Sequence, residues 1–121
     1  MIKEYDFHCP HCNATLNSNG VIVLKTRRPN GDIGEIQMDT NLGNYQYTHE
    51  PPVNFEPGEM VDFLCTSCGH CLNSEEFDNY AQLKMVVDDA IEFDILFSRK
   101  AGVQKTYLIT EDGIESYAGN Q

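Results

Sequence analysis

Two Cys-x-x-Cys pairs constrain the fold of this chain more than any other feature. The first has the sequence Cys-Pro-His-Cys at residues 9–12, and the second has the sequence Cys-Thr-Ser-Cys at residues 65–68. Each pair places two thiols on one tight turn, and two such turns that face each other supply the four soft ligands of a tetrahedral metal site. The predicted ligands of one metal ion are Cys9, Cys12, Cys65 and Cys68.

Length and composition predict one globular domain over residues 1–121. The chain has 121 residues, of which 40% are hydrophobic, and it contains 6 Tyr, 6 Phe and no Trp. A chain of this size buries about two-thirds of the surface that it exposes when unfolded, which is enough for a modest core. We therefore expect the metal to support the fold without carrying all of it.

The charge balance argues against nucleic acid as a partner. The chain has 19 acidic and 8 basic side chains, for a formal net charge of -11. Binding to phosphates depends on clustered Lys and Arg that release counterions. The densest basic group is Lys25, Arg27 and Arg28, with Arg99 and Lys100 as a second pair, and we expect both groups to lie in solvated turns.

The expected location is the cytoplasm, with no membrane attachment. Residues 1–7 include Lys3, Glu4 and Asp6 and have no apolar segment of signal-peptide length, and no stretch approaches the length of a membrane span. In a reducing compartment, paired cysteines at this spacing favour metal over disulfides. The odd number of cysteines, 5, agrees with that interpretation.

Alternating apolar residues and turn signals predict an all-β protein made of antiparallel hairpins. Three hairpins are expected, at residues 21–26 with 33–38, 83–87 with 91–97, and 106–110 with 114–117. In the second hairpin Ile91, Phe93, Ile95 and Phe97 are predicted to share the core face. No internal repeat is expected beyond the two cysteine turns.

The segments between the hairpins carry weaker signals. Residues 73–80 have a plausible N-cap followed by acidic residues, which predicts at most one short helix. Residues 41–58 are rich in Gly, Asn, Pro and aromatic residues, which predicts a long loop with one short strand at 45–48. Such a loop is either a binding surface or a cover over the core.

The two cysteine turns and their flanking residues resemble the knuckles of zinc ribbons. Each knuckle has the sequence Phe-x-Cys-x-x-Cys, and Asn13 or Gly69 follows its second cysteine, where a left-handed backbone turns the amides toward the sulfurs. The resemblance covers the knuckles and the strands that carry them. It implies a metal-bearing ribbon at one end, formed by residues 5–12 and 60–68, beside an additional β-sheet portion.

A shell of four thiolates predicts one structural zinc ion, Zn²⁺. All its coordination positions are filled, so no water is held for activation. Iron in a rubredoxin-like site uses the same ligands and is the alternative metal. Cys71, three residues beyond Cys68, is interpreted as a small buried hydrophobe, although replacement of one ligand by Cys71 stays open. His8, His11 and His70 are interpreted as surface or structural residues, with ligation as their alternative.

Nothing in the sequence nominates a catalytic or cofactor-binding residue, so the chain is predicted not to be an enzyme. It has no nucleophile elbow, phosphate loop or dinucleotide fingerprint, and its paired acids fall in predicted turns or at a helix start. The favoured function is a non-catalytic protein–protein interaction module. The alternatives are a small accessory subunit of a larger enzyme complex and an iron electron carrier, and the oligomeric state is left open.

Overall fold

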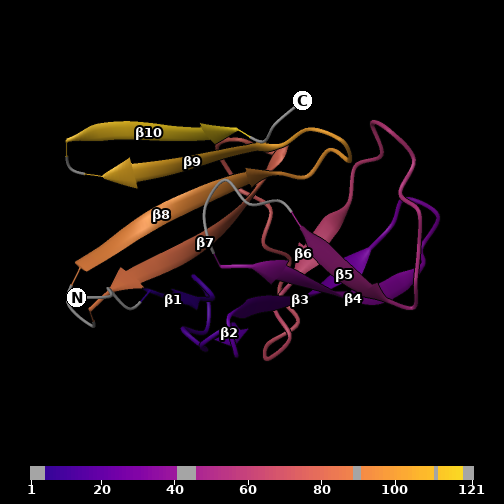
Figure 1. Cartoon of the computed structure of the whole chain (residues 1–121), viewed down its shortest axis with the longest axis horizontal. Coiled ribbons are helices and arrows are strands. Elements are labelled where there is room, and N and C mark those ends of the chain that lie inside the picture. Colours follow the sequence, from indigo (N-terminus) through magenta and orange to yellow (C-terminus); the bar gives the residue numbers. More distant parts are fainter. Residues whose placement is uncertain (1–4, 41–45, 89–90, 111, 119–121) are drawn as a thin grey trace.

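Two antiparallel sheets form the computed structural model of this chain, which describes residues 5–40, 46–88, 91–110 and 112–118 (Figure 1). The first sheet has the order β1 (Tyr5–His8), β7 (Tyr80–Val87), β8 (Ile91–Ser98), β9 (Lys105–Thr110) and β10 (Gly113–Ala118). The second has the order β2 (Asn17–Ser18), β3 (Val21–Arg27), β4 (Ile33–Asp39) and β5 (Tyr47–Glu50), with β6 (Asp62–Leu64) also paired to β3. The described residues contain no helix, so the prediction of an all-β fold is confirmed.

The three predicted hairpins are present as β3–β4, β7–β8 and β9–β10. The predicted strand at 45–48 is β5, displaced to Tyr47–Glu50, and Tyr45 lies outside the described residues. The expected short helix at 73–80 is a turn. There the Ser74 hydroxyl accepts a hydrogen bond from the Phe77 amide at 3.1 Å, as an N-cap would, but the chain enters β7 at Tyr80.

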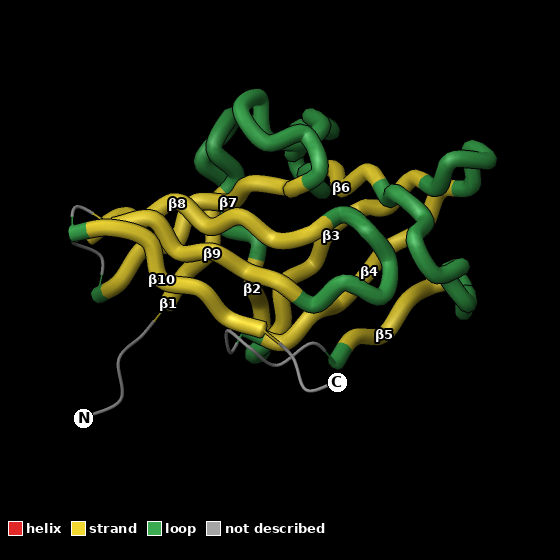
Figure 2. The backbone as a smooth tube through the Cα atoms, turned by 90° about the horizontal axis from the view of Figure 1, so that it is seen from above, coloured by secondary structure: helices red, strands yellow, loops and turns green. Residues whose placement is uncertain are grey.

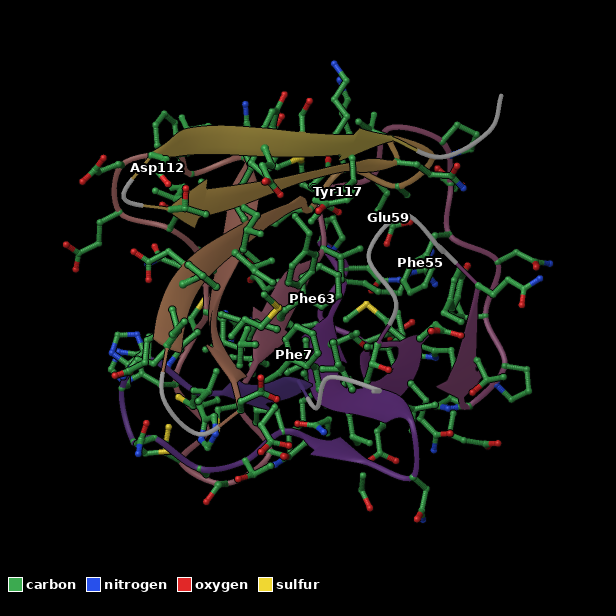
Figure 3. The ribbon with its side chains drawn as sticks, turned by 60° about the vertical axis from the view of Figure 1, so that its left-hand side comes forward. Phe7, Phe55, Glu59, Phe63, Asp112 and Tyr117 are labelled. Carbon is green, nitrogen blue, oxygen red and sulfur yellow. The ribbon has the colours of Figure 1, made fainter. Side chains whose placement is uncertain are left out.

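One hydrophobic core lies between the two sheets and draws side chains from both. Burial alternates along β7 from Ala81 to Val87, as expected for a strand with one covered face. Phe7 and Phe63 point into the space between the sheets (Figure 3) and are both buried. The predicted core face of β8 is only partly correct, because Ile91 lies at the turn end of the hairpin and is 54% exposed.

The sequence around each knuckle is part of a longer repeat, so the expectation of no repeat beyond the cysteine turns is wrong. Residues 6–18 read Asp-Phe-His-Cys-Pro-His-Cys-Asn-Ala-Thr-Leu-Asn-Ser, and residues 62–74 read Asp-Phe-Leu-Cys-Thr-Ser-Cys-Gly-His-Cys-Leu-Asn-Ser. The two segments share Asp, Phe, both Cys, Leu, Asn and Ser at equivalent positions. We call β1 to β5 with their loops the first unit, and β6 to β10 with their loops the second unit.

The strand pairings of the two units correspond residue by residue. Leu24 of β3 lies opposite Ile36 of β4, and Leu83 of β7 lies opposite Ile95 of β8. The next strands continue the correspondence, because His49 of β5 lies opposite Ile36 while Leu108 of β9 lies opposite Ile95. Thus β3, β4 and β5 are equivalent to β7, β8 and β9, and β10 is an addition to the second unit.

Each unit places its first strand in the sheet of the other unit. In β1, Phe7 lies opposite Met85 of β7, and in β6 the equivalent Phe63 lies opposite Thr26 of β3. The strands that carry the two knuckles therefore pair with β7 and β3, so residues 5–12 and 60–68 meet at one end as predicted without forming a two-stranded ribbon of their own. Each knuckle is instead anchored by a strand that belongs to the sheet of the other unit.

Gly34 marks a local difference between the units, and it leads to a stability prediction. Its counterpart by register is Phe93, and in the first unit the His49 ring occupies the space beside the backbone of Gly34. His49 Nε2 pairs with the hydroxyl of buried Thr26 at 2.6 Å, and its Nδ1 donates to the Pro51 carbonyl at 2.7 Å. A polar contact thus takes the place of an aromatic side chain.

Gly34→Ala is expected to lower the free energy of unfolding by about 1–3 kcal/mol, the usual cost of overpacking. A Cβ atom at this position would overlap the His49 ring and would lie 2.9 Å from the Glu50 carbonyl oxygen. Urea unfolding of Gly34→Ala, alone and combined with His49→Ala, measures the effect. Removal of the ring should recover part of the lost stability, and a single variant as stable as the wild type would contradict the packing described.

Candidate metal centre

The four predicted cysteine ligands converge at one point. Cys9 Sγ lies 3.8 Å from Cys68 Sγ, and Cys12 Sγ lies 3.7 Å from Cys65 Sγ. All four sulfur atoms lie within 4.8 Å of one another. A tetrahedral site with metal–sulfur bonds of about 2.3 Å places its sulfurs about 3.8 Å apart. The cluster therefore has the dimensions that a four-thiolate metal site needs, and each unit contributes two of its cysteines.

Backbone amides point at the first sulfur of each knuckle in the same pattern. Cys9 Sγ accepts from the amides of His11 at 3.3 Å and Cys12 at 3.5 Å. In the second knuckle, Cys65 Sγ accepts from the amides of Ser67 at 3.3 Å and Cys68 at 3.4 Å. Hydrogen bonds of this kind favour a charged sulfur over a neutral thiol. Both turns are thus built to hold thiolates.

The residues that leave the two knuckles have the left-handed backbone predicted for them. Asn13 has φ of 63° and Gly69 has φ of 73°. The Asn13 amide donates to the Cys9 carbonyl at 2.8 Å, and the Gly69 amide donates to the Cys65 carbonyl at 2.9 Å. Glycine adopts this conformation without strain, and asparagine is among the most tolerant of the other residues.

Burial divides the cluster into two inner and two outer sulfurs. Cys9 and Cys65 are buried, whereas Cys12 and Cys68 are exposed. Burial raises the pKa of Cys9 to about 12. The pKa of Cys12 falls to about 7, chiefly because the Ala14 backbone donates a hydrogen bond to its sulfur. A thiolate at Cys9 thus needs a nearby positive charge, and a bound metal ion would supply it.

A second repeated contact supports the strands that carry the cysteines. Asn17 donates to the Asp6 carboxylate at 3.4 Å, and the equivalent Asn73 donates to the Asp62 carboxylate at 3.3 Å. Asp62 also accepts one hydrogen bond from Arg99 at 2.6 Å. Sequence analysis did not single out these Asp–Asn pairs, although alignment of the two knuckle segments reveals them.

The other residues considered as ligands lie outside the sulfur cluster. Cys71 is half-buried and forms an isolated β-bridge with Leu64. His11 and His70 are exposed and stack on each other, with ring centroids 3.7 Å apart. His8 pairs through Nδ1 with the Asn13 carbonyl at 3.0 Å. Within the described residues, no second group of three or more Cys, His, Asp or Glu side chains converges to hold a metal.

The three arginines of the two basic groups form ion pairs within the protein, Arg99 with Asp62 at 2.6 Å. Arg27 pairs with Asp62 at 2.9 Å, and Arg28 pairs with Glu59 at 2.7 Å. The hydrogen bond from Arg28 lowers the pKa of the Glu59 carboxyl. Lys25 and Arg27 thus lie in β3 and not in the predicted solvated turn, and the Arg27 and Arg28 guanidinium groups neutralise acidic neighbours.

The fold and the site define a class of protein, an all-β chain of two interlocked units with four cysteines at their junction. No family model matches this chain, and comparison with curated proteins and with solved structures likewise finds no match. In the part of the chain that the structure describes, no helix has the length and apolar character needed to cross a membrane.

Proposed function

We propose that this chain is a cytosolic zinc protein whose four-cysteine site is structural, and that it acts as a non-catalytic protein–protein interaction module. The observation that carries the proposal is the convergence of Cys9, Cys12, Cys65 and Cys68 to within 4.8 Å. One pair comes from each unit, so a bound ion cross-links segments that are distant in the sequence. Such a link stabilises the folded state because the unfolded chain has no preformed site.

A structural role follows from the donor set. Four sulfurs complete a tetrahedral shell and leave no position for a water or a substrate. A closed sulfur shell suits zinc, which has no redox chemistry and readily accepts tetrahedral geometry. The exposed sulfurs of Cys12 and Cys68 favour an iron electron carrier as the second candidate, because electron transfer needs an accessible edge.

The interaction role is supported by charge. With a net charge of -11, the chain attracts basic partners and speeds its encounter with them. An accessory subunit of a larger enzyme would use the same negative charge to bind a permanent partner. The test is reconstitution: a partner isolated with the tagged chain under native conditions is purified and recombined with it. A chain that forms no complex with any purified candidate overturns the interaction role.

Metal analysis separates zinc from iron. Purified protein is expected to be colourless and to contain one zinc ion per chain, measured by elemental analysis and by native mass spectrometry. The protein is expressed in medium that contains both zinc and iron, so that neither metal is excluded by its absence from the medium. A red protein with a thiolate-to-iron absorption band would support the electron carrier instead.

A further inference from the structure

The outer edge of β5 differs from the outer edge of β9, its counterpart in the second unit. There, β10 pairs with β9, with Tyr117 opposite Thr106 and Ile114 opposite Ile109. By register β5 is the counterpart of β9, yet among the described residues β5 pairs with β4 alone (Figure 2). An open edge presents main-chain groups to which another strand can be added. Thus β10 covers the edge of β9 in the second unit, and no described strand covers the equivalent edge of β5 in the first unit.

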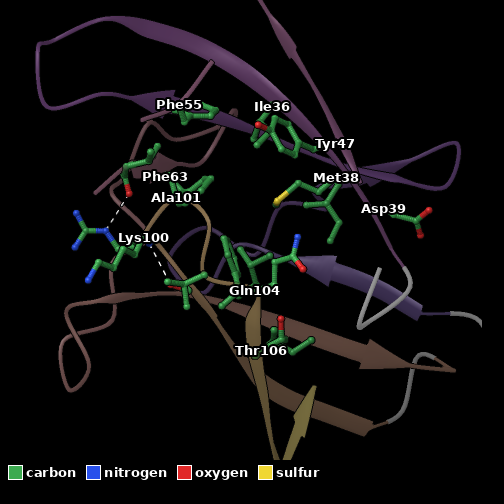
Figure 4. A pocket seen from close by; sticks show the side chains of 18 of the residues that line it. Ile36, Met38, Asp39, Tyr47, Phe55, Phe63, Lys100, Ala101, Gln104 and Thr106 are labelled. Atoms are coloured by element: carbon green, nitrogen blue, oxygen red, sulfur yellow. Dashed lines mark hydrogen bonds between the residues drawn. The ribbon is translucent and has the colours of Figure 1, made fainter. Parts of the chain in front are cut away.

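A cavity of about 330 Å³ opens beside the inner face of β5. Its walls are mainly apolar, with Met38, Tyr47 and Phe55 on one side and Gln104 and Thr106 facing them (Figure 4). Tyr47 is 48% exposed there. In the second unit the corresponding inner position of the added strand holds Tyr117, which packs against the core. A side chain from a strand beside β5 would reach the cavity in the same way.

The outer face of the same edge carries two carboxylates on neighbouring strands, with Lys25 of β3 beyond them opposite Glu35. Glu50 of β5 is exposed and lies directly opposite Glu35 of β4. Like charges in this arrangement destabilise a sheet. A Lys or Arg on an added strand opposite Glu50 would relieve that repulsion. A second copy of this chain is disfavoured as the added strand, because it also has a net charge of -11 and would be repelled.

We propose that an extended basic segment of a partner protein adds as an antiparallel strand to β5, in the position that β10 holds beside β9. An aromatic side chain of the segment lies opposite Tyr47 over the cavity, and a Lys or Arg lies opposite Glu50. Main-chain hydrogen bonds provide affinity, and the two side-chain positions provide specificity. The proposal rests on the proposed function, since it names the kind of partner that the interaction module would bind.

A labelled peptide with the central sequence Lys-Val-Lys-Tyr tests the proposal, with Glu-Val-Glu-Tyr as its matched control. Fluorescence anisotropy should show that the full-length protein prefers the Lys peptide, and amide hydrogen exchange should show protection at residues 47–50. Glu50→Lys should weaken the Lys peptide about fivefold and strengthen the Glu peptide. Tyr47→Ala should weaken the Lys peptide about tenfold. Melting by circular dichroism verifies that each variant is folded.

Glu115→Lys on β10 is the charge-matched control, because Glu115 is also exposed on an edge strand. It should leave the affinity for the Lys peptide unchanged. Equal weakening by Glu115→Lys and Glu50→Lys, protection at β10 in place of β5, or no binding by the folded protein would each overturn the proposal. So would sedimentation that shows a dimer lost in Tyr47→Ala. A reconstituted partner that leaves residues 47–50 unprotected would overturn strand addition while the interaction role stands.

Discussion

Cys9→Ser is expected to abolish stoichiometric metal binding and to lower the free energy of unfolding by more than about 4 kcal/mol. Cys9 is buried and its sulfur receives two backbone hydrogen bonds, so a serine there cannot take part in a closed sulfur shell. Loss of the ion removes the link between the two units. Native mass spectrometry measures the metal content, and circular dichroism measures the melting temperature.

Because the two units are equivalent, the same loss is expected at the matching cysteine of the second knuckle. Cys65 occupies the position of Cys9 in the second knuckle, so Cys65→Ser should have the same effect within about 1 kcal/mol. Cys71→Ala serves as the matched control, because the Cys71 sulfur lies outside the cluster, and this variant should keep one ion per chain. Metal loss in Cys71→Ala, or a full metal complement in Cys9→Ser, would show that the ligand set is wrong.

Phe7→Ala is expected to destabilise the fold by about 3–5 kcal/mol, the usual cost of removing a buried aromatic ring. Phe7 is 1% exposed and lies opposite Met85 of the other unit, so its loss leaves a cavity in the core that both units share. Urea unfolding followed by circular dichroism measures the change, with metal content checked in the same samples.

Two further Phe→Ala variants, one at a buried site and one at an exposed site, show whether the effect depends on burial in the shared core. Phe63→Ala, at the equivalent site in β6, should cost nearly as much, because Phe63 is 7% exposed and belongs to the same core. Phe77 is 49% exposed, and Phe77→Ala should change the free energy of unfolding by no more than about 0.5 kcal/mol. A Phe7→Ala variant that unfolds like Phe77→Ala would contradict the shared core.

Local features of the fold were predictable because they depend on neighbouring residues. The hairpins follow from alternating apolar residues on both sides of turns such as residues 29–31. The knuckle geometry follows from the cysteine spacing and from residues that tolerate a left-handed backbone, Asn13 and Gly69. Each signal is contained within a short segment, so no knowledge of distant contacts is needed.

The exchange of strands could not be predicted in the same way. β3 and β7 carry Leu-Lys at equivalent positions and bury the same face, so β1 fits the edge of either strand by pattern alone. Only the packing of the whole chain decides that β1 pairs with β7 and that β6 pairs with β3. Alignment of residues 6–18 with 62–74 would, however, have revealed the repeat in advance.

The partners of His49 were missed for a related reason. Its contacts are with Thr26, which is far away in the sequence, and with the backbone beside Gly34. The only sequence signal is the difference between the units, since Gly34 stands where the second unit has Phe93. That signal becomes visible only when the register of both sheets is known.

X-ray absorption spectroscopy of the purified protein tests the central claim most directly, because it reports the ligand atoms of the bound metal. We predict one zinc ion with four sulfur ligands at about 2.3 Å and no nitrogen or oxygen ligand. That shell would place Cys9, Cys12, Cys65 and Cys68 around a closed structural site. A shell with a nitrogen or oxygen ligand, or with fewer than four sulfurs, would contradict it.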